Sequence, residues 1–286
     1  MGFVKEEFNI KNVKLLDFLI ESFKITESEA KKMVNRGRVA FNGERIKKYN
    51  QNYDGILTII YFKPQPLGLK PIFETEDFAI FDKPSGVAVH PKGLTHSQTL
   101  LDDVRFLYGK DANLAHRLDK ETSGLIIASK NKWSEKILKT MFEKKEIQKY
   151  YIAKVEGKIE KTLTINKPIL TNSDLNIKMK VLIDKKGKSA KTIITPLKYE
   201  NGKTIVLAKP LTGRQHQIRV HLYHIGHRII GDPLYGVETE VADKYLKGEL
   251  SSADRIKFTG SDRLELHSNR VVFEYGNRKY DISSKL

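Results

Sequence analysis

An aspartate between two cations is the first feature of this sequence that could do chemistry. Asp119 lies between Arg117 and Lys120, and a Thr-Ser-Gly tripeptide follows closely. A carboxylate near opposite charge stays ionised, which suits a nucleophile or a base better than an acid. A simpler alternative is that the side chain of Asp119 only caps this turn. The charge pattern alone leaves both interpretations open.

A second polar stretch, residues 211–222, combines two arginines with two histidines. Arg214 follows a glycine, a position in which an arginine could pair with a carboxylate or a phosphate. His221 and two further histidines recur at intervals of three residues, as they would on one face of a helix. Because no acidic residue follows until Asp232 and the His-x-x-Glu-His pattern is absent, histidines that face solvent or RNA are the better interpretation than a metal site.

Two more segments contain residues that could contact a ligand. Tyr151 follows Lys149 by two residues in a run that is typical of a strand. An aromatic ring amid lysines can stack on a base, although tyrosines in strands usually serve packing. Residues 83–91 predict a strand that ends in a turn, whose shape Gly and Pro fix. Taken singly, none of these segments decides a function.

The composition narrows the class of partner. The 286 residues include 51 Lys and Arg against 35 Asp and Glu, a net charge of +16, which favours nucleic acid first and an anionic membrane second. The hydrophobic content of 40% predicts a folded protein. The sequence has no cysteine, which excludes disulfides and thiolate metal sites and fits a reducing cytoplasm. No apolar run is long enough for a membrane helix, and the first fourteen residues do not resemble a signal peptide, so we expect a cytoplasmic protein.

The first sixty residues have the pattern of a small basic module. Hydrophobic residues recur at helical spacing in residues 11–23, and Thr26 with Glu29 predicts a capping box that opens a second helix. Asn42-Gly43, between alternating residues, predicts a type I′ hairpin. Arginines and lysines surround this hairpin, which indicates a surface for a polyanion.

A proline-containing stretch at residues 62–68 breaks every pattern and predicts a linker. We therefore divide the chain into three parts, namely a first domain at 1–64, a linker at 65–70 and a second domain at 71–286.

The second domain alternates strand-like runs with few helices. Thr99 and Asp102 predict the start of a short helix, and Trp133 to Lys145 is amphipathic. The predicted strands are 78–83, 125–128, 150–155, 162–165, 178–183, 190–196 and 204–209. Such hairpin-spaced strands predict an α+β fold, with a mixed and mainly antiparallel sheet flanked by helices.

Taken together and in this order, the motifs resemble those of the RluA family of RNA pseudouridine synthases. Residues 116–125 match the family's HRLDxxTSGL motif letter for letter. Four further segments match KPxGxxVH at 83–90, KxYxAxVxG at 149–157, GRTHQIRVHL at 213–222, with Gln215 in the place of Thr, and GDxxYG at 231–236. The first domain resembles the S4 RNA-binding domain of the RluC/RluD-like branch, although the usual arginine of its first helix is replaced around residues 14–17.

The resemblance implies an isomerase that converts specific uridines in RNA to pseudouridine and needs no metal or cofactor. The expected substrate is 23S ribosomal RNA of the large subunit, with tRNA as the alternative. Asp119 takes the place of the catalytic aspartate, Arg214 that of the arginine that pairs with it, and Tyr151 that of the tyrosine under the target base. The uridine would be flipped out of its stack to reach Asp119.

The resemblance also implies a set of substrate-binding residues, namely His116, Arg117, Leu118, Thr122, Lys149, His216 and Arg219. We expect RNA as the partner, no membrane and a monomer. Two other classes of protein remain as alternatives. A non-catalytic RNA-binding or ribosome assembly factor would account for the charge but not for Asp119, and a metal-dependent nuclease would use the histidines.

Overall fold

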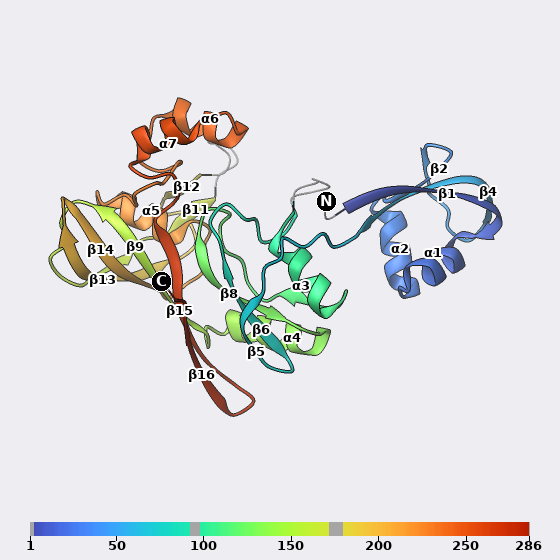
Figure 1. Cartoon of the computed structure of the whole chain (residues 1–286), viewed down its shortest axis with the longest axis horizontal. Helices are drawn as coiled ribbons and strands as arrows, with labels where there is room; N and C mark the ends of the chain where they lie inside the picture. Colours follow the sequence, from blue (N-terminus) through green and yellow to red (C-terminus); the bar gives the residue numbers. More distant parts are fainter. Residues whose placement is uncertain (1–2, 92–97, 172–179, 286) are drawn as a thin grey trace. The chain divides into compact units, whose positions relative to one another are not determined.

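The computed structural model describes residues 3–91, 98–171 and 180–285 (Figure 1). The described residues divide into two compact units, one that contains residues 3–66 and one that contains residues 67–90 together with those after 98. In the described part of the chain, no helix is long and apolar enough to cross a membrane.

The first unit is a small sheet with two helices. Its elements are β1 (Phe3–Lys14), α1 (Leu15–Phe23), α2 (Glu27–Asn35), β2 (Val39–Phe41), β3 (Glu44–Arg45) and β4 (Asn52–Phe62), with the strands in the order β1-β4-β2-β3. Thr26 and Glu29 form the predicted capping box of α2. Asn42 and Gly43 both have positive φ, at 47° and 84°, as a type I′ hairpin requires.

The helix predicted over residues 11–23 is wrong in its first part. Residues up to Lys14 belong to β1, and α1 begins at Leu15. Val13 pairs with Tyr53 of β4, about forty positions along the chain. This partner is distant in sequence, so the local hydrophobic spacing indicated only the helix.

The second unit contains a larger sheet. The strands of this sheet are β5 (Pro71–Glu74), β6 (Phe78–Lys83), β7 (Asn113–Leu114), β8 (Ser123–Ser129), β9 (Gln148–Glu156), β10 (Leu163–Asn166), β13 (Lys191–Glu200), β14 (Lys203–Pro210), β15 (Leu266–Tyr275) and β16 (Arg278–Ser283). A separate two-stranded sheet of the same unit pairs β11 (Ile169–Thr171) with β12 (Val181–Ile183). Its helices are α3 (Leu100–Tyr108), α4 (Lys132–Glu143), α5 (Gln217–His224), α6 (Thr239–Lys247) and α7 (Ser252–Thr259).

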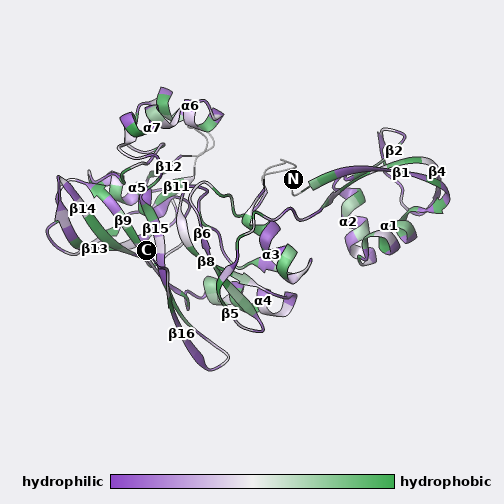
Figure 2. Cartoon of the chain, viewed as in Figure 1, coloured by the Kyte–Doolittle hydropathy of each residue, from purple (hydrophilic) through white to green (hydrophobic). Residues whose placement is uncertain are grey.

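The main path of the large sheet runs β10-β13-β14-β9-β15-β8-β6-β5, while β16 pairs with β15 and β7 with β8. Its named strands pair antiparallel except β15 and β8, which confirms the predicted α+β fold with a mixed, mainly antiparallel sheet. Bands of hydrophobic and hydrophilic residues alternate along β13 and β14, as expected for strands with one buried face (Figure 2). One core packs α4 against the sheet around Phe78, Leu125 and Leu138.

Most of the predicted elements of this unit are confirmed, including α3 between its Thr99 cap and Gly109. The predicted strand at 178–183 is described only in part, because residues 178 and 179 lie outside the described residues, and β12 covers 181–183 but not Lys180. Helices α6 and α7 and the hairpin of β15 and β16 were not predicted.

The parallel contact of β8 with β15 depends on a glycine next to the HRLD motif. Gly124 has φ of 103° and pairs with Ser268 of β15. A Cβ atom at Gly124 would lie 2.4 Å from the carbonyl oxygen of Ser268, which no side chain tolerates. The glycine therefore allows the two strands to meet where the chain leaves Asp119.

Candidate active site

Asp119 begins a tight turn just before β8, and the neighbouring residues hold the backbone of this turn. The amide of Thr122 donates to the carbonyl of Asp119 at 3.1 Å. The carbonyl of Lys120 accepts from Nζ of Lys83 and from the amide of Gly86, both at 3.0 Å. The KPxG segment that precedes the motif by about thirty residues thus fixes the position of the aspartate turn.

Lys83 is fully buried, and its Nζ also donates to two carbonyls of its own loop, those of Pro84 and Val87, both at 2.9 Å. Burial lowers the pKa of Lys83 to about 8, although the Glu121 and Asp119 carboxylates oppose this shift. A lysine that spends all three protons on backbone carbonyls serves as a structural clamp.

A second set of contacts reaches the same turn from α6 and α7. The buried Glu121 carboxylate accepts from Arg255 at 2.6 Å and from the hydroxyl of Tyr245 at 2.9 Å. The hydroxyl of Ser85 donates to the backbone carbonyl of Glu121 at 2.7 Å. The turn that carries Asp119 is therefore held from two sides before any substrate arrives.

The guanidinium group that faces Asp119 belongs to Arg219 on α5. Its Nη1 lies 3.2 Å from Oδ2 of Asp119, while Nε and Nη2 bond the two oxygens of Asp232, both at 2.8 Å. Arg219 and Asp232 are almost completely buried, whereas the Asp119 side chain is 26% exposed. Burial alone would lower the pKa of Arg219, but Asp232 and Asp119 outweigh it and raise this pKa.

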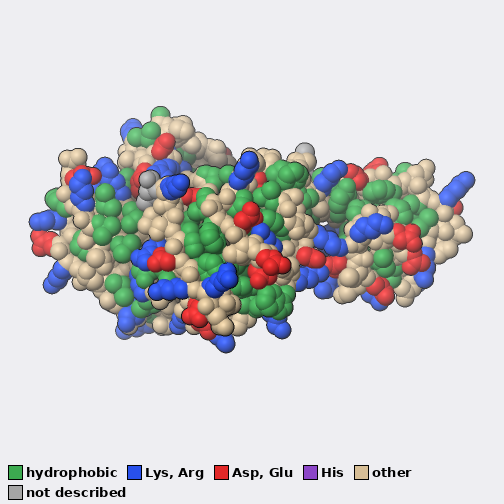
Figure 3. Space-filling model, turned by 60° about the horizontal axis from the view of Figure 1, so that its bottom comes forward, with side chains coloured by type: hydrophobic (Ala, Val, Ile, Leu, Met, Phe, Trp, Pro, Cys, Tyr) green, Lys and Arg blue, Asp and Glu red, His purple; other side chains and the backbone are tan. Residues whose placement is uncertain are grey.

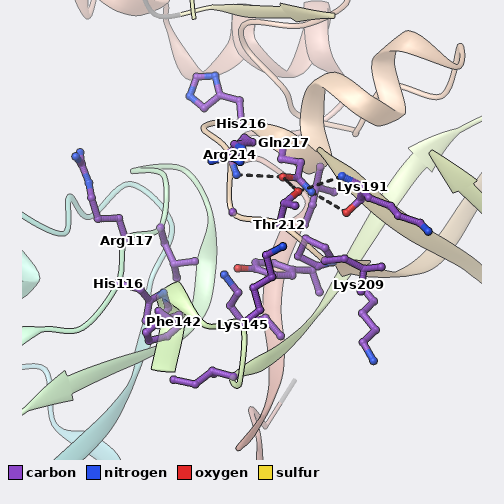
Figure 4. Close-up of a pocket in the computed structure, with 18 of the residues that line it drawn as sticks. His116, Arg117, Phe142, Lys145, Lys191, Lys209, Thr212, Arg214, His216 and Gln217 are labelled. Carbon is purple, nitrogen blue, oxygen red and sulfur yellow. Dashed lines mark hydrogen bonds between the residues drawn. The ribbon is translucent and has the colours of Figure 1, made fainter. Parts of the chain in front are cut away.

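The predicted ion pair between Arg214 and Asp119 is wrong. Arg214 is exposed, and its Nε donates to the carbonyl of Ser189 at 3.1 Å. The reason lies in the start of α5, where the Gln217 side chain accepts from the backbone amide of Arg214 at 3.0 Å and holds the preceding loop (Figure 4). Arg219 lies five residues further along the chain, within α5, and is buried, so it takes the place expected of Arg214.

His216 also faces Asp119, from the N-cap position of α5. Its backbone is left-handed, with φ of 51°, and its Nε2 lies 3.8 Å from Oδ1 of Asp119. Nδ1 hydrogen-bonds with the hydroxyl of Tyr235 at 3.1 Å. Burial, assisted by the Arg219 guanidinium, lowers the pKa of His216 to about 4, so its ring is neutral at physiological pH.

Tyr151 and Lys149 point to the same side of β9, because they are two residues apart in a strand. Tyr151 is buried, and burial raises the pKa of its hydroxyl, so the hydroxyl keeps its proton at neutral pH. Burial also lowers the pKa of Lys149, whose Nζ lies 5.4 Å from the ring centre of Phe142. His116 also lies beside Phe142, with ring centres 4.4 Å apart, and Nε2 of His116 accepts from the Ile127 amide.

These side chains surround one cavity of about 1120 Å³ (Figure 4). Every site residue named from the sequence lies on its wall, namely His116, Arg117, Leu118, Asp119, Thr122, Lys149, Tyr151, Arg214, His216 and Arg219. Arg117 is exposed and extends away from the other labelled side chains. A concave, polar site with an accessible carboxylate in its wall is suited to reactions on a bound nucleoside.

The sequence did not reveal several residues of the site. Lys145, Lys191 and Lys209 line the cavity, but they lie outside any motif and had no visible signal. Asp232 and Tyr235 belong to the GDxxYG motif, which was noticed without a role for either residue. The ion pair of Asp232 with Arg219 depends on which side chains the fold buries, and no sequence pattern indicates it.

Of the three histidines expected to face solvent or RNA, His224 is exposed and His227 is half-buried, but His221 faces neither. His221 is fully buried, and its ring nitrogens bond Thr192 Oγ1 at 2.8 Å and the carbonyl of Lys167 at 3.0 Å. Its role is to attach α5 to the sheet.

Comparisons with known proteins show to which family the chain belongs. Residues 77–224 match the family described as RNA pseudouridylate synthase. An uncharacterized RNA pseudouridine synthase of Helicobacter pylori strain J99 is 39% identical over all of this chain and 97% of its own length. The mitochondrial tRNA pseudouridine(32) synthase of Saccharomyces cerevisiae is 34% identical over 88% of this chain and 56% of its own length. The ribosomal large subunit pseudouridine synthase C of Buchnera aphidicola is 31% identical over 96% and 90%.

A solved structure has a similar fold. Human RNA pseudouridylate synthase domain containing 1 superposes with a TM-score of 0.61, at 24% identity over 78% of this chain and 86% of its own. The chain belongs to the RNA pseudouridylate synthase family, and is thus an isomerase that acts on RNA.

Proposed function

We propose that this enzyme converts uridines of 23S ribosomal RNA to pseudouridine and that Asp119 is its catalytic carboxylate. The role of Asp119 is supported by the different surroundings of its two carboxylate oxygens. Oδ2 is engaged by Arg219, while the side chain remains 26% exposed on the cavity wall. One oxygen is thus held in place, and the other is left for the sugar of a bound nucleotide.

The reaction breaks the bond between N1 of uracil and C1′ of ribose and rejoins the base through C5. Asp119 either attacks C1′ or removes the 2′ proton, and either step uses the oxygen that Arg219 leaves free. The target nucleotide must leave its stack to reach the cavity, at a cost of a few kcal/mol. A turn and a guanidinium that are already in place spare the enzyme the cost of ordering them during the reaction.

Tyr151, which also lines the cavity, supports the same assignment. Its buried ring offers a flat surface on which the uracil can lie, and its hydroxyl stays protonated because burial raises its pKa. The C5 proton of the rotated uracil must leave after the new bond forms, and a neutral phenol is too weak a base to take it, so we assign Tyr151 the placement of the base rather than this proton transfer.

The cations around the cavity supply contacts for the phosphates that flank the flipped nucleotide. Arg117, Arg214, Lys145, Lys191 and Lys209 are cavity residues on different loops and strands. Such contacts add affinity with little sequence choice, and they weaken steeply with added salt. They offset the cost of flipping.

We propose that the first unit is an S4-type domain that makes a second contact with RNA. In this proposal the S4-type domain spans 1–64, the linker 65–70 and the catalytic domain 71–286. Support comes from its two short helices beside a sheet and from the exposed cations Arg36, Arg45, Lys47 and Lys48 around its hairpin. Lysines and arginines are spread over both units on the face shown in Figure 3. Two joined sites raise the effective concentration of RNA at the catalytic unit.

The ribosomal target rests on this basic first unit and on the likeness to the Buchnera enzyme, whose name gives the large ribosomal subunit. The yeast relative, named for tRNA, makes tRNA the second candidate. We further propose that the enzyme works as a monomer in the cytoplasm, which gel filtration and cell fractionation can test.

Mapping pseudouridines by carbodiimide adducts, in ribosomal RNA and tRNA from cells with and without the gene, tests the proposed target. We expect one or more sites in 23S RNA to vanish without the gene and to return when it is restored. Loss of pseudouridines only in tRNA would show that tRNA, the second candidate, is the substrate. No loss in either RNA would favour a non-catalytic RNA-binding factor.

A further inference from the structure

The hydrogen bonds of Tyr235 decide which nitrogen of His216 carries its proton. The Tyr235 oxygen accepts from the amide of Val181 at 3.0 Å, so its own single proton must go elsewhere. The His216 Nδ1 atom lies 3.1 Å away and the Val181 carbonyl oxygen 3.4 Å away. The shorter contact favours Nδ1 as the acceptor, and the neutral ring then carries its proton on Nε2.

The charge beside Nε2 favours the same tautomer. Oδ1 of Asp119 lies 3.8 Å from Nε2, which is too far for a hydrogen bond but close enough for strong repulsion of a lone pair. If Nε2 lacked a proton, its lone pair would face a carboxylate oxygen. Burial beside the Arg219 guanidinium also disfavours a doubly protonated ring. His216 therefore presents one N–H donor to the cavity, next to the free oxygen of Asp119.

The position of this donor identifies the substrate atom it can reach. In either version of the reaction, an Asp119 oxygen must come within about 3 to 3.5 Å of C1′ or of the proton on C2′. The 2′-hydroxyl is attached to C2′, directly beside both of these atoms. Nε2 of His216 lies on the same side of the cavity as that oxygen, so the 2′-hydroxyl falls within its reach.

We propose that His216 is a specificity-determining residue that donates a hydrogen bond from Nε2 to the 2′-hydroxyl of the target nucleotide, with Tyr235 fixing the proton on Nε2. This inference rests on the proposed role of Asp119. It makes the site selective for a ribonucleotide, because a 2′-deoxynucleotide leaves this donor without an acceptor. Tyr235 acts only through His216 and is a positioning residue.

Two amide substitutions separate this role from a structural one. The side-chain nitrogen of Gln can occupy the place of Nε2, whereas that of Asn reaches only the place of Nδ1. His216→Gln therefore keeps a donor toward Asp119, and His216→Asn removes it. Asn tolerates the left-handed backbone at this position better than other residues except Gly, so the donor-free variant is the one that suits the local fold.

The substrate is the shortest synthetic stem–loop around a mapped uridine that the wild-type enzyme converts at its full rate. It is made with either uridine or 2′-deoxyuridine at that one position, and Kd is measured for both by filter binding. We expect the wild-type enzyme and His216→Gln to bind the ribonucleotide form about tenfold more tightly. His216→Asn should bind both forms equally, and Tyr235→Phe should show reduced discrimination.

Equal binding of the two forms by the wild-type enzyme would overturn the inference, as would undiminished discrimination by His216→Asn. Thermal melting of each variant shows whether it is folded, and Tyr235→Phe provides a second route if His216→Asn is not. Conversion of the ribonucleotide form by the wild-type enzyme, followed in parallel, reports on the proposed function separately. If Asp119→Asn converts this form normally, the role of Asp119 fails, whatever the binding data show.

Discussion

Replacement of Arg219 should affect stability and catalysis in separable ways. In Arg219→Gln, the buried carboxylate of Asp232 loses both of its 2.8 Å bonds to the guanidinium, and Asp119 loses its 3.2 Å contact. Breaking one partner of a buried ion pair costs about 3 to 5 kcal/mol. For a unit of this size the loss corresponds to a decrease in melting temperature of about 6 to 20 °C.

The double variant Arg219→Gln with Asp232→Asn removes both buried charges together. In the wild-type structure, the backbone amides of Leu234 and Tyr235 donate to Oδ1 of Asp232 at 2.9 and 3.1 Å. The side-chain oxygen of an asparagine can accept the same two bonds. We therefore expect the double variant to regain most of the stability that the single variant loses. It should remain inactive, since Asp119 still lacks its guanidinium.

Calorimetry or urea unfolding measures stability, and release of tritium from 5-tritiated uridine in RNA measures catalysis. Arg214→Gln is the matched control, because Arg214 is exposed and its guanidinium donates to the Ser189 carbonyl rather than to a carboxylate. It should melt like the wild-type protein and lose RNA affinity rather than kcat. The reasoning is refuted if the double variant is as unstable as the single one, or if Arg219→Gln keeps full activity.

Three further changes test the contacts around the site. The pKa of Lys83 is lowered from 10.5 to about 8, so between these two pH values the unfolded state binds more protons than the folded state. The free energy of unfolding of the wild-type protein, measured by urea titration relative to Lys83→Met, should therefore rise by about 3 kcal/mol from pH 7 to pH 10.5. A difference between the two proteins that stays constant with pH would contradict this. Glu121→Gln breaks a buried ion pair with Arg255 and should lower both stability and kcat. Its control, Glu240→Gln, affects an exposed pair and should change stability by less than about 0.5 kcal/mol. Equal melting curves for these two variants would argue against the contact from α7. Replacing Lys47 and Lys48 by Gln should reduce the slope of log Kd against log salt by about one for each phosphate that these lysines neutralise, and an unchanged slope would place RNA elsewhere.

The fold was predictable where the signals are local. The Thr26 capping box, the Asn42-Gly43 hairpin and the helix after Thr99 each depend on residues within a few positions of one another. The strand before Leu15 was missed because its partner, β4, begins only at Asn52. Local spacing carries no information about such distant pairs.

The motifs predicted residues that line the cavity, but not which of them pair with one another. The motifs named every predicted residue that lines the cavity, since they lie in short segments that the sheet brings together. They could not tell Arg214 from Arg219, because the choice depends on which side of α5 faces inward and on Asp232, which balances the buried charge. The cavity lysines other than Lys149 were not predicted for a different reason, because they lie outside any motif.

Tritium release by Asp119→Asn in single-turnover conditions tests the central claim most directly. The RNA is transcribed with 5-tritiated uridine, and Asp111→Asn, which changes an aspartate outside the cavity, serves as the control. We predict that Asp119→Asn binds this RNA nearly as well as the wild-type enzyme and releases no tritium above background, while Asp111→Asn behaves as wild type. Release at the wild-type rate by Asp119→Asn would contradict the assignment of Asp119 as the catalytic carboxylate.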